Sequence, residues 1–209
     1  MAAILVAAFP MSKVSADFRV DLSRADQHRQ LELLSARRNW GWALLLVGWL
    51  HLVTFCFCHY LTTIGYHQSP GYLAMWVGEL LGMVVIFRVC GGTRIADPAL
   101  PLELFIRRVW LAYFLLAFNL GSMNTLRGHA LFEFFPATAS LASFAFIMMS
   151  LVVSWRFLIA AVVMFVSGLL MAANLLNEYL VFAFAWWLVL NGIGMSLIRQ
   201  QRQVYNRAT

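Results

Sequence analysis

The stretch from Asn39 to Gly78, NWGWALLLVGWLHLVTFCFCHYLTTIGYHQSPGYLAMWVG, contains no Asp, Glu, Lys or Arg. A membrane-spanning helix needs about 20 predominantly apolar residues, so this stretch is long enough for one complete span and the start of a second. The turn-like segment His67-Gln68-Ser69-Pro70-Gly71 separates the two. We therefore predict the first span at Trp40–Thr63.

Similar apolar stretches recur along the rest of the chain. Of the 209 residues, 62% are apolar or aromatic and 11% are charged, whereas a soluble domain has about 25% charged residues. This composition excludes a disordered tail, a disulfide-stapled secreted domain and an ordinary cytosolic enzyme. We expect an all-α polytopic membrane protein, a bundle of six transmembrane helices within residues 39–198. The five further spans are predicted at Tyr72–Phe87, Val109–Leu126, Phe134–Trp155, Phe157–Asn177 and Tyr179–Ile198.

The distribution of Lys and Arg indicates the orientation of the bundle. With six spans, fourteen of the fifteen Lys and Arg residues lie on one side of the membrane and only Arg127 lies on the other. Because cytoplasmic loops carry the excess of basic residues, we expect both termini in the cytoplasm (N-in/C-in) and a bacterial cytoplasmic (inner) membrane as the location. The net charge of +6 then reflects contact with anionic lipid. It does not indicate nucleic-acid binding.

The two ends of the chain are expected to be cytoplasmic. Residues 1–38 form an amino-terminal segment in which an amphipathic helix begins near Ser23 and lies at the membrane surface; a solvated linker is the alternative. Residues 199–209 form a basic tail. Both Met1 and Met11 are reasonable translation starts.

His51 and Glu79 are ionisable residues near the middle of predicted spans. His51 is halfway along the first span and Glu79 is near the middle of the second. Counted from the loop between these antiparallel spans, their depths differ by only about 5 Å at 1.5 Å per residue. Ionisable groups at such depths are costly and are functional candidates by default. A hydrogen bond between His51 and Glu79 is therefore geometrically available, and these two residues are the first candidate site.

Other residues of the spans extend this hypothesis. Gly78 and Gly82 have the Gly-x-x-x-Gly spacing that permits close helix packing. An uncharged polar residue lies near mid-depth in each remaining span. These residues either join the pair in a ligand or ion pathway or act as interhelical glue, that is, they form hydrogen bonds that hold helices together. These residues are Asn119, Ser143, Ser167 and Asn191.

A second polar group is predicted at the outer surface. Histidines there can act as proton switches or metal ligands; the alternative is that they are exposed interface residues without a role. The members of this outer-face cluster are His59, His67, Arg127, His129, Glu133 and Glu178.

The sequence lacks the catalytic and phosphate-binding motifs that would indicate a particular enzyme class. The only histidines within spans, His51 and His59, share one helix, which disfavours a haem; a haem between His59 and His129 is a minor alternative, and no metal site is predicted. The leading hypothesis is a non-catalytic membrane module, either a sensor-type domain or a subunit of a larger complex. The alternative is a small cation- or proton-coupled transporter that uses Glu79 and His51. The expected partners are the lipid bilayer and either a protein at the cytoplasmic face or a second copy of the chain, with no nucleic acid.

Overall fold

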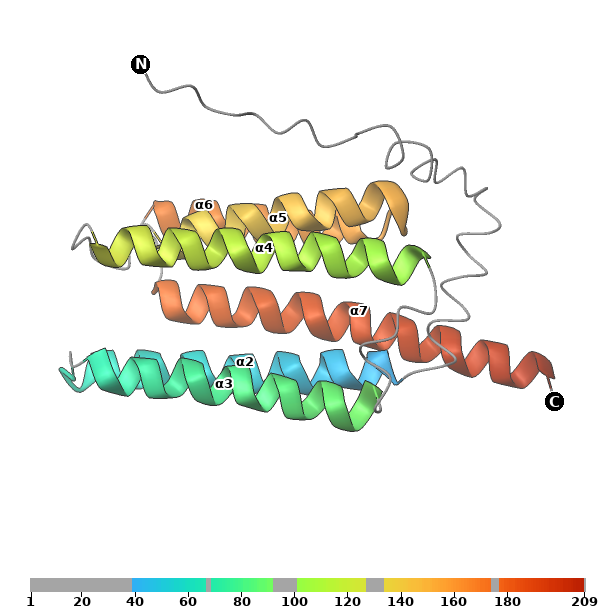
Figure 1. Ribbon diagram of the computed structural model, residues 1–209, viewed down its shortest axis with the longest axis horizontal. Helices are drawn as coiled ribbons and strands as arrows, with labels where there is room; N and C mark the ends of the chain where they lie inside the picture. Colours follow the sequence, from blue (N-terminus) through green and yellow to red (C-terminus); the bar gives the residue numbers. More distant parts are fainter. Residues whose placement is uncertain (1–38, 67–68, 92–100, 127–133, 174–176, 209) are drawn as a thin grey trace, which may run out of the picture.

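The computed structural model describes residues 39–66, 69–91, 101–126, 134–173 and 177–208. This part of the chain forms six α-helices that run along the long axis of the molecule (Figure 1). The amphipathic helix predicted within residues 1–38 lies outside the described residues. The helices are α2 (Trp40–Thr63), α3 (Ser69–Gly91), α4 (Pro101–Leu126), α5 (Phe134–Val152), α6 (Phe157–Ala172) and α7 (Glu178–Ala208).

Helix α4 begins at Pro101, about two turns before the predicted start at Val109. The first turn of α4 contains a buried acid, Glu103. Its carboxylate accepts a hydrogen bond from the guanidinium of Arg107 at 2.9 Å. An i,i+4 pair of this kind stabilises a helix. The predicted span begins only at Val109 because Glu103, Arg107 and Arg108 are charged, and the spans were predicted from uncharged stretches.

The last two helices also differ from the predicted spans. Helix α6 has 16 residues and ends at Ala172, before the predicted end at Asn177. The side chain of Asn177 instead caps α7, since its Oδ1 accepts hydrogen bonds from the amides of Tyr179 and Leu180 at 3.1 and 3.4 Å. Helix α7 then continues through the basic tail to Ala208.

The described residues include the α5–α6 connection and the first residues after α2. The chain reverses between α5 and α6 at Ser154–Arg156, where a turn was predicted, and the Arg156 Nη1 donates a hydrogen bond to Ser196 Oγ of α7 at 3.0 Å. After α2 the chain passes through Gly65, whose φ of 74° lies in the left-handed region that favours glycine.

Helix α7 lies in the middle of the bundle. In Figure 1 the α2–α3 pair lies on one side of α7, and α4, α5 and α6 lie on the other. The most extensive helix contacts are those of α2 with α7 and of α5 with α6, followed by α2 with α3, α4 with α5 and α6 with α7. The two groups of helices are therefore joined mainly through α7.

Three glycines allow α2 and α7 to approach closely. A Cβ atom added to Gly194 would lie 2.7 Å from the carbonyl oxygen of Gly41, and one added to Gly48 would lie 2.7 Å from Asn191 Nδ2. Small residues permit such contact between membrane helices. The sequence analysis did not identify this glycine seam, formed by Gly41, Gly48 and Gly194.

The outer surface of the bundle is apolar on every helix, whereas the interior is packed with aromatic and small side chains. A soluble monomer rarely exposes large contiguous apolar patches, so this surface is that of a membrane-type helical protein. Examples of large side chains that are more than half exposed are Val89, Phe118, Leu151 and Leu188.

Four described helical segments are long and apolar enough to cross a membrane. Helix α6 is apolar but shorter, and α3 is not among the four. A helical membrane-type protein is therefore established, while the count of six spans and their orientation stay predictions. The four segments are Trp40–Thr63, Leu102–Met123, Phe134–Val152 and Glu178–Gln203.

Candidate functional site

His51 of α2 and Glu79 of α3 are in direct contact inside the bundle. The distance between His51 Nδ1 and Glu79 Oε1 is 2.5 Å, and the two side chains are only 13% and 9% exposed. The helices run antiparallel from the turn after Thr63, which places the two residues at matching depth. The structure thus joins the two residues that the depth argument paired, and we call them the His–Glu pair.

The hydrogen bond within the pair requires a proton. Either His51 Nδ1–H donates to a Glu79 carboxylate, or a protonated Glu79 donates to Nδ1. The other ring nitrogen, Nε2, is buried and has no hydrogen-bond partner among the described residues. Buried polar atoms are nearly always satisfied, so this nitrogen is a site for a small polar ligand, and it accepts a proton when the ring hydrogen is on Nδ1.

Aromatic rings enclose the imidazole. The centroid of the His51 ring lies 4.3 Å from Phe55, 5.5 Å from Phe182 and 6.0 Å from Trp186. The indole Nε1 of Trp186 is also buried without a partner in the described part of the chain. The pair therefore occupies an apolar environment, where adding or removing one charge has a large energetic effect.

Two further titratable side chains face the pair. Cys58 of α2 and Tyr113 of α4 lie close enough to Glu79 to interact with it electrostatically. Tyr113 is buried and contacts Trp186 edge to face, with ring centroids 5.9 Å apart. The sequence analysis missed Tyr113, although a phenol in the middle of an apolar span is a recognisable signal. Its presence connects the pair to α4, across α7.

The mid-depth polar residues do not gather around the pair. Ser143 of α5 donates a hydrogen bond to the carbonyl of Ala161 of α6 at 2.9 Å, which joins those two helices. Ser167 and Asn191 donate to carbonyls of their own helices, and Asn119 is exposed on α4. None of the four has a hydrogen bond to the His–Glu pair within the described ranges, so the structure favours the glue interpretation for Ser143 in particular.

The predicted outer-face cluster is only partly described. His59 is half-buried, and its Nδ1 has no partner among the described side chains. Glu178 is buried at the first residue of α7. The other four members, His67, Arg127, His129 and Glu133, lie outside the described residues.

The two glycines beside Glu79 differ in their surroundings. A Cβ on Gly82 would lie 2.7 Å from Leu50 Cδ2, so Gly82 lies against α2. Gly78 is exposed and a Cβ there would meet nothing within 4 Å of described atoms. Only Gly82 therefore contributes to the close approach of α2 and α3.

The described residues contain no group of three or more His, Cys, Asp or Glu side chains that could hold a metal ion. Comparisons with protein-family models, curated proteins and solved structures find no significant match to this chain. The functional argument therefore rests on the geometry of the His–Glu pair.

Proposed function

We propose that this protein is a non-catalytic integral membrane module, of sensor type or a subunit of a larger complex, whose responsive group is the His–Glu pair. The observation that carries the proposal is the buried contact between His51 and Glu79, together with the unpartnered Nε2. Histidine changes its charge between about pH 5 and pH 8. With only the proton of the hydrogen bond, the pair is a neutral imidazole and a carboxylate and carries one negative charge, and a second proton makes it neutral overall. Gain or loss of that second proton therefore changes the net charge that lies among the apolar rings.

The positions of the neighbouring residues support a conformational response. The pair belongs to α2 and α3, whereas Tyr113 belongs to α4 and Trp186 to α7. A charge gained at this point weakens packing among helices from both halves of the bundle, because burial disfavours an uncompensated charge. A change in protonation can therefore alter the separation of α3 and α4.

The proposed setting is a bacterial cytoplasmic membrane, crossed six times with both termini inside. The one-sided distribution of Lys and Arg supports this orientation. The turn at Ser154–Arg156 supports separate passages by α5 and α6. A cytoplasmic protein partner would meet the basic end of α7, where Arg199 and Arg202 are exposed.

Distance measurements between spin labels test the sensor proposal. Labels are placed on the exposed positions Val84 of α3 and Leu115 of α4 in the full chain, reconstituted in lipid nanodiscs. We expect the α3–α4 distance to differ between about pH 5 and about pH 8, where histidine titrates, and Glu79→Gln to abolish the difference. Glu103→Gln is the matched control, since Glu103 is an equally buried acid near the end of α4. A pH response that survives in Glu79→Gln would exclude the pair as the responsive group.

A second candidate is a small cation- or proton-coupled transporter, favoured by the vacant acceptor at His51 Nε2. A transporter needs a midplane group that binds and releases its coupling ion. It predicts pH-dependent uptake by proteoliposomes and loss of that uptake in Glu79→Gln. Unchanged uptake in this variant would exclude Glu79 as the coupling group.

A further inference from the structure

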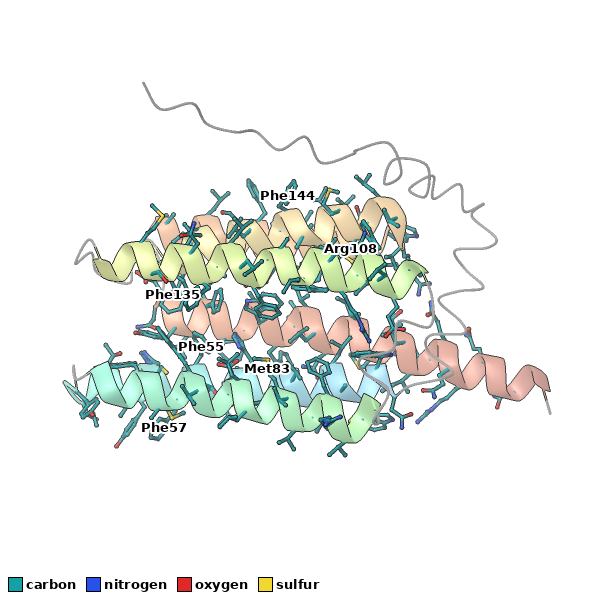
Figure 2. All side chains as sticks on the ribbon, in the orientation of Figure 1. Phe55, Phe57, Met83, Arg108, Phe135 and Phe144 are labelled. Atoms are coloured by element: carbon teal, nitrogen blue, oxygen red, sulfur yellow. The ribbon has the colours of Figure 1, made fainter. Side chains whose placement is uncertain are left out.

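Three phenylalanine rings from three helices meet close to the His–Glu pair. Phe55 of α2, Phe135 of α5 and Phe182 of α7 are all buried. Their ring centroids are 5.9 Å apart for Phe55 and Phe135, and 5.2 Å apart for the other two pairs. Figure 2 shows Phe55 and Phe135 in the interior between the two groups of helices, whereas Phe57 and Phe144 point away from it. We call Phe55, Phe135 and Phe182 the phenylalanine plug.

The plug has the His–Glu pair on one side and a tyrosine on the other. On the first side, His51 contacts Phe55 and Phe182. On the other side, Tyr179 lies 6.4 Å from Phe55 and 5.1 Å from Phe135, measured between ring centroids. Because Tyr179 is the second residue of α7, this side faces the end of the bundle that holds the α2–α3 turn.

Hydroxyl groups extend from the plug toward that end. Tyr179 stacks on Tyr72 with centroids 6.2 Å apart, and the Tyr72 hydroxyl lies 3.0 Å from Thr62 Oγ1. Tyr72 also reaches the carbonyl of Tyr66 at 2.9 Å, and Thr62 reaches the carbonyl of Cys58 at 3.0 Å. The hydroxyls of Thr62 and Tyr72 each have one proton and two acceptors within range, so a rotation can redirect the proton. We call Thr62, Tyr72 and Tyr179 the hydroxyl cluster.

We propose that the phenylalanine plug is the barrier that controls proton exchange between the hydroxyl cluster and the His–Glu pair. The proposal rests on the pair being the protonatable centre of the proposed function. Three packed rings leave no polar atom to pass a proton across, so exchange requires a local opening that admits water. The plug draws one ring from each of three helices, and a relative movement of any of them opens it.

Among the described residues, Cys58 of α2 and Tyr113 of α4 interact electrostatically with Glu79, while α7 contributes Phe182 and Trp186, which do not titrate. On the other side of the plug, Tyr179 follows the buried Glu178 and interacts electrostatically with it and with Cys58. A proton from Glu178, from the hydroxyl cluster or from water at this end therefore has to pass the plug before it reaches the pair.

Hydrogen–deuterium exchange at His51 tests the proposal without requiring transport or signalling. The full chain is labelled with ¹⁵N-histidine, placed in lipid nanodiscs and transferred to D₂O, and the His51 imidazole N–H signal is identified by its loss in His51→Gln. In each exchange event a proton leaves to water and a deuteron replaces it. We expect slow exchange in the unmodified chain and exchange at least about tenfold faster in Phe135→Ala, because the opening becomes easier.

Phe146→Ala is the matched control. Phe146 is on the same helix and is as fully buried as Phe135, but it contacts Trp110, Phe157 and Trp186 and not the plug. Its substitution is expected to leave the exchange rate within about twofold, since it leaves the opening at the plug intact. If Phe135→Ala does not fold, Phe182→Leu is the replacement variant, because leucine keeps most of the side-chain volume of phenylalanine. A smaller acceleration of exchange at His51 is expected from Phe182→Leu.

Three outcomes would overturn the proposal. They are fast exchange in the unmodified chain, equal acceleration by Phe135→Ala and Phe146→Ala, and no acceleration by any plug variant. The exchange rate at His51 is measured independently of the α3–α4 distances that test the sensor function. Failure of the plug and failure of the proposed function are therefore distinguishable.

Discussion

At the scale of single residues, the His–Glu pair combines two side chains that are each unfavourable alone in an apolar bundle. Their contact satisfies His51 Nδ1 and one oxygen of Glu79, and it leaves Nε2 as the vacant atom. The aromatic rings that surround His51 supply no hydrogen bond to it. Stability and responsiveness thus depend on the same hydrogen bond.

A double-mutant cycle on this pair is the residue-scale prediction. His51→Leu or Glu79→Leu alone leaves its partner buried without compensation, which costs about 3–5 kcal/mol. The double variant is expected to recover much of this loss, and unfolding of the full chain in detergent measures all four forms. Independent, additive losses would contradict the coupling. A stable double variant that has lost function would identify the pair as functional, and one that keeps function would identify it as structural.

At the scale of helices, α7 holds the two groups together through its close contact with α2. The contact depends on backbone atoms at the glycine seam, where the Cβ of any other residue has no room. The α5–α6 turn also contacts α7, through the hydrogen bond from Arg156 to Ser196. Packing at the seam consequently fixes the position of α2 against α7, and with it the contacts of His51 with Glu79 and Trp186.

Gly194→Ala tests the importance of the seam. The added Cβ would lie 2.7 Å from the Gly41 carbonyl oxygen, so the helices must separate, at a cost of about 1–3 kcal/mol. Thermal unfolding of the full chain in detergent measures the loss. Gly192→Ala is the matched control on the same helix, because nothing lies within 4 Å of its added Cβ among the described atoms. Equal effects of the two substitutions would show that α2 and α7 do not rely on this approach.

At the scale of the whole molecule, the bundle has two distinct ends. The end of α2 and the starts of α3 and α7 lie at one end, and α7 projects beyond the other helices at the opposite end (Figure 1). The hydroxyl cluster belongs to the first end, because Thr62, Tyr72 and Tyr179 lie within the last turn of α2 and the first turns of α3 and α7. A helix of 31 residues is about 46 Å long at 1.5 Å per residue. This exceeds the roughly 30 Å of hydrocarbon in a bilayer, so the basic end of α7 extends into water.

Cysteine labelling tests the predicted orientation. With the three native cysteines replaced by alanine, a cysteine is placed at Ile64 or Asn206 and exposed to a membrane-impermeant maleimide in intact cells. We expect Ile64→Cys to react from outside and Asn206→Cys to react only after permeabilisation, because cytoplasmic segments carry the excess of Lys and Arg. Trp155→Cys, in the exposed α5–α6 turn, should behave like Asn206→Cys. Labelling of Ile64 and Asn206 from the same side would refute the six-span topology.

Much of the molecule follows from the sequence alone. The apolar runs indicated the membrane class and the approximate position of every described helix, and the similar depths of His51 and Glu79 made available the contact that the structure shows. Depth can be read in this way because each residue advances a helix by about 1.5 Å. The missed parts were helix ends that contain charged or polar residues, such as Glu103 in α4 and Arg199 in α7.

Only the tertiary structure decided which side chains surround the pair. Phe182 and Trp186 belong to a helix distant in sequence from His51, and nothing in their local pattern indicates that they lie against its ring. For Asn191 the sequence left open a pathway or a contact between helices, and the structure shows its amide donating to the carbonyl of Trp187 in its own helix, beside Gly48. The physical reason is that sequence spacing determines the position of a residue along its helix. The rotation of that helix and its choice of neighbour depend on how all the side chains pack together.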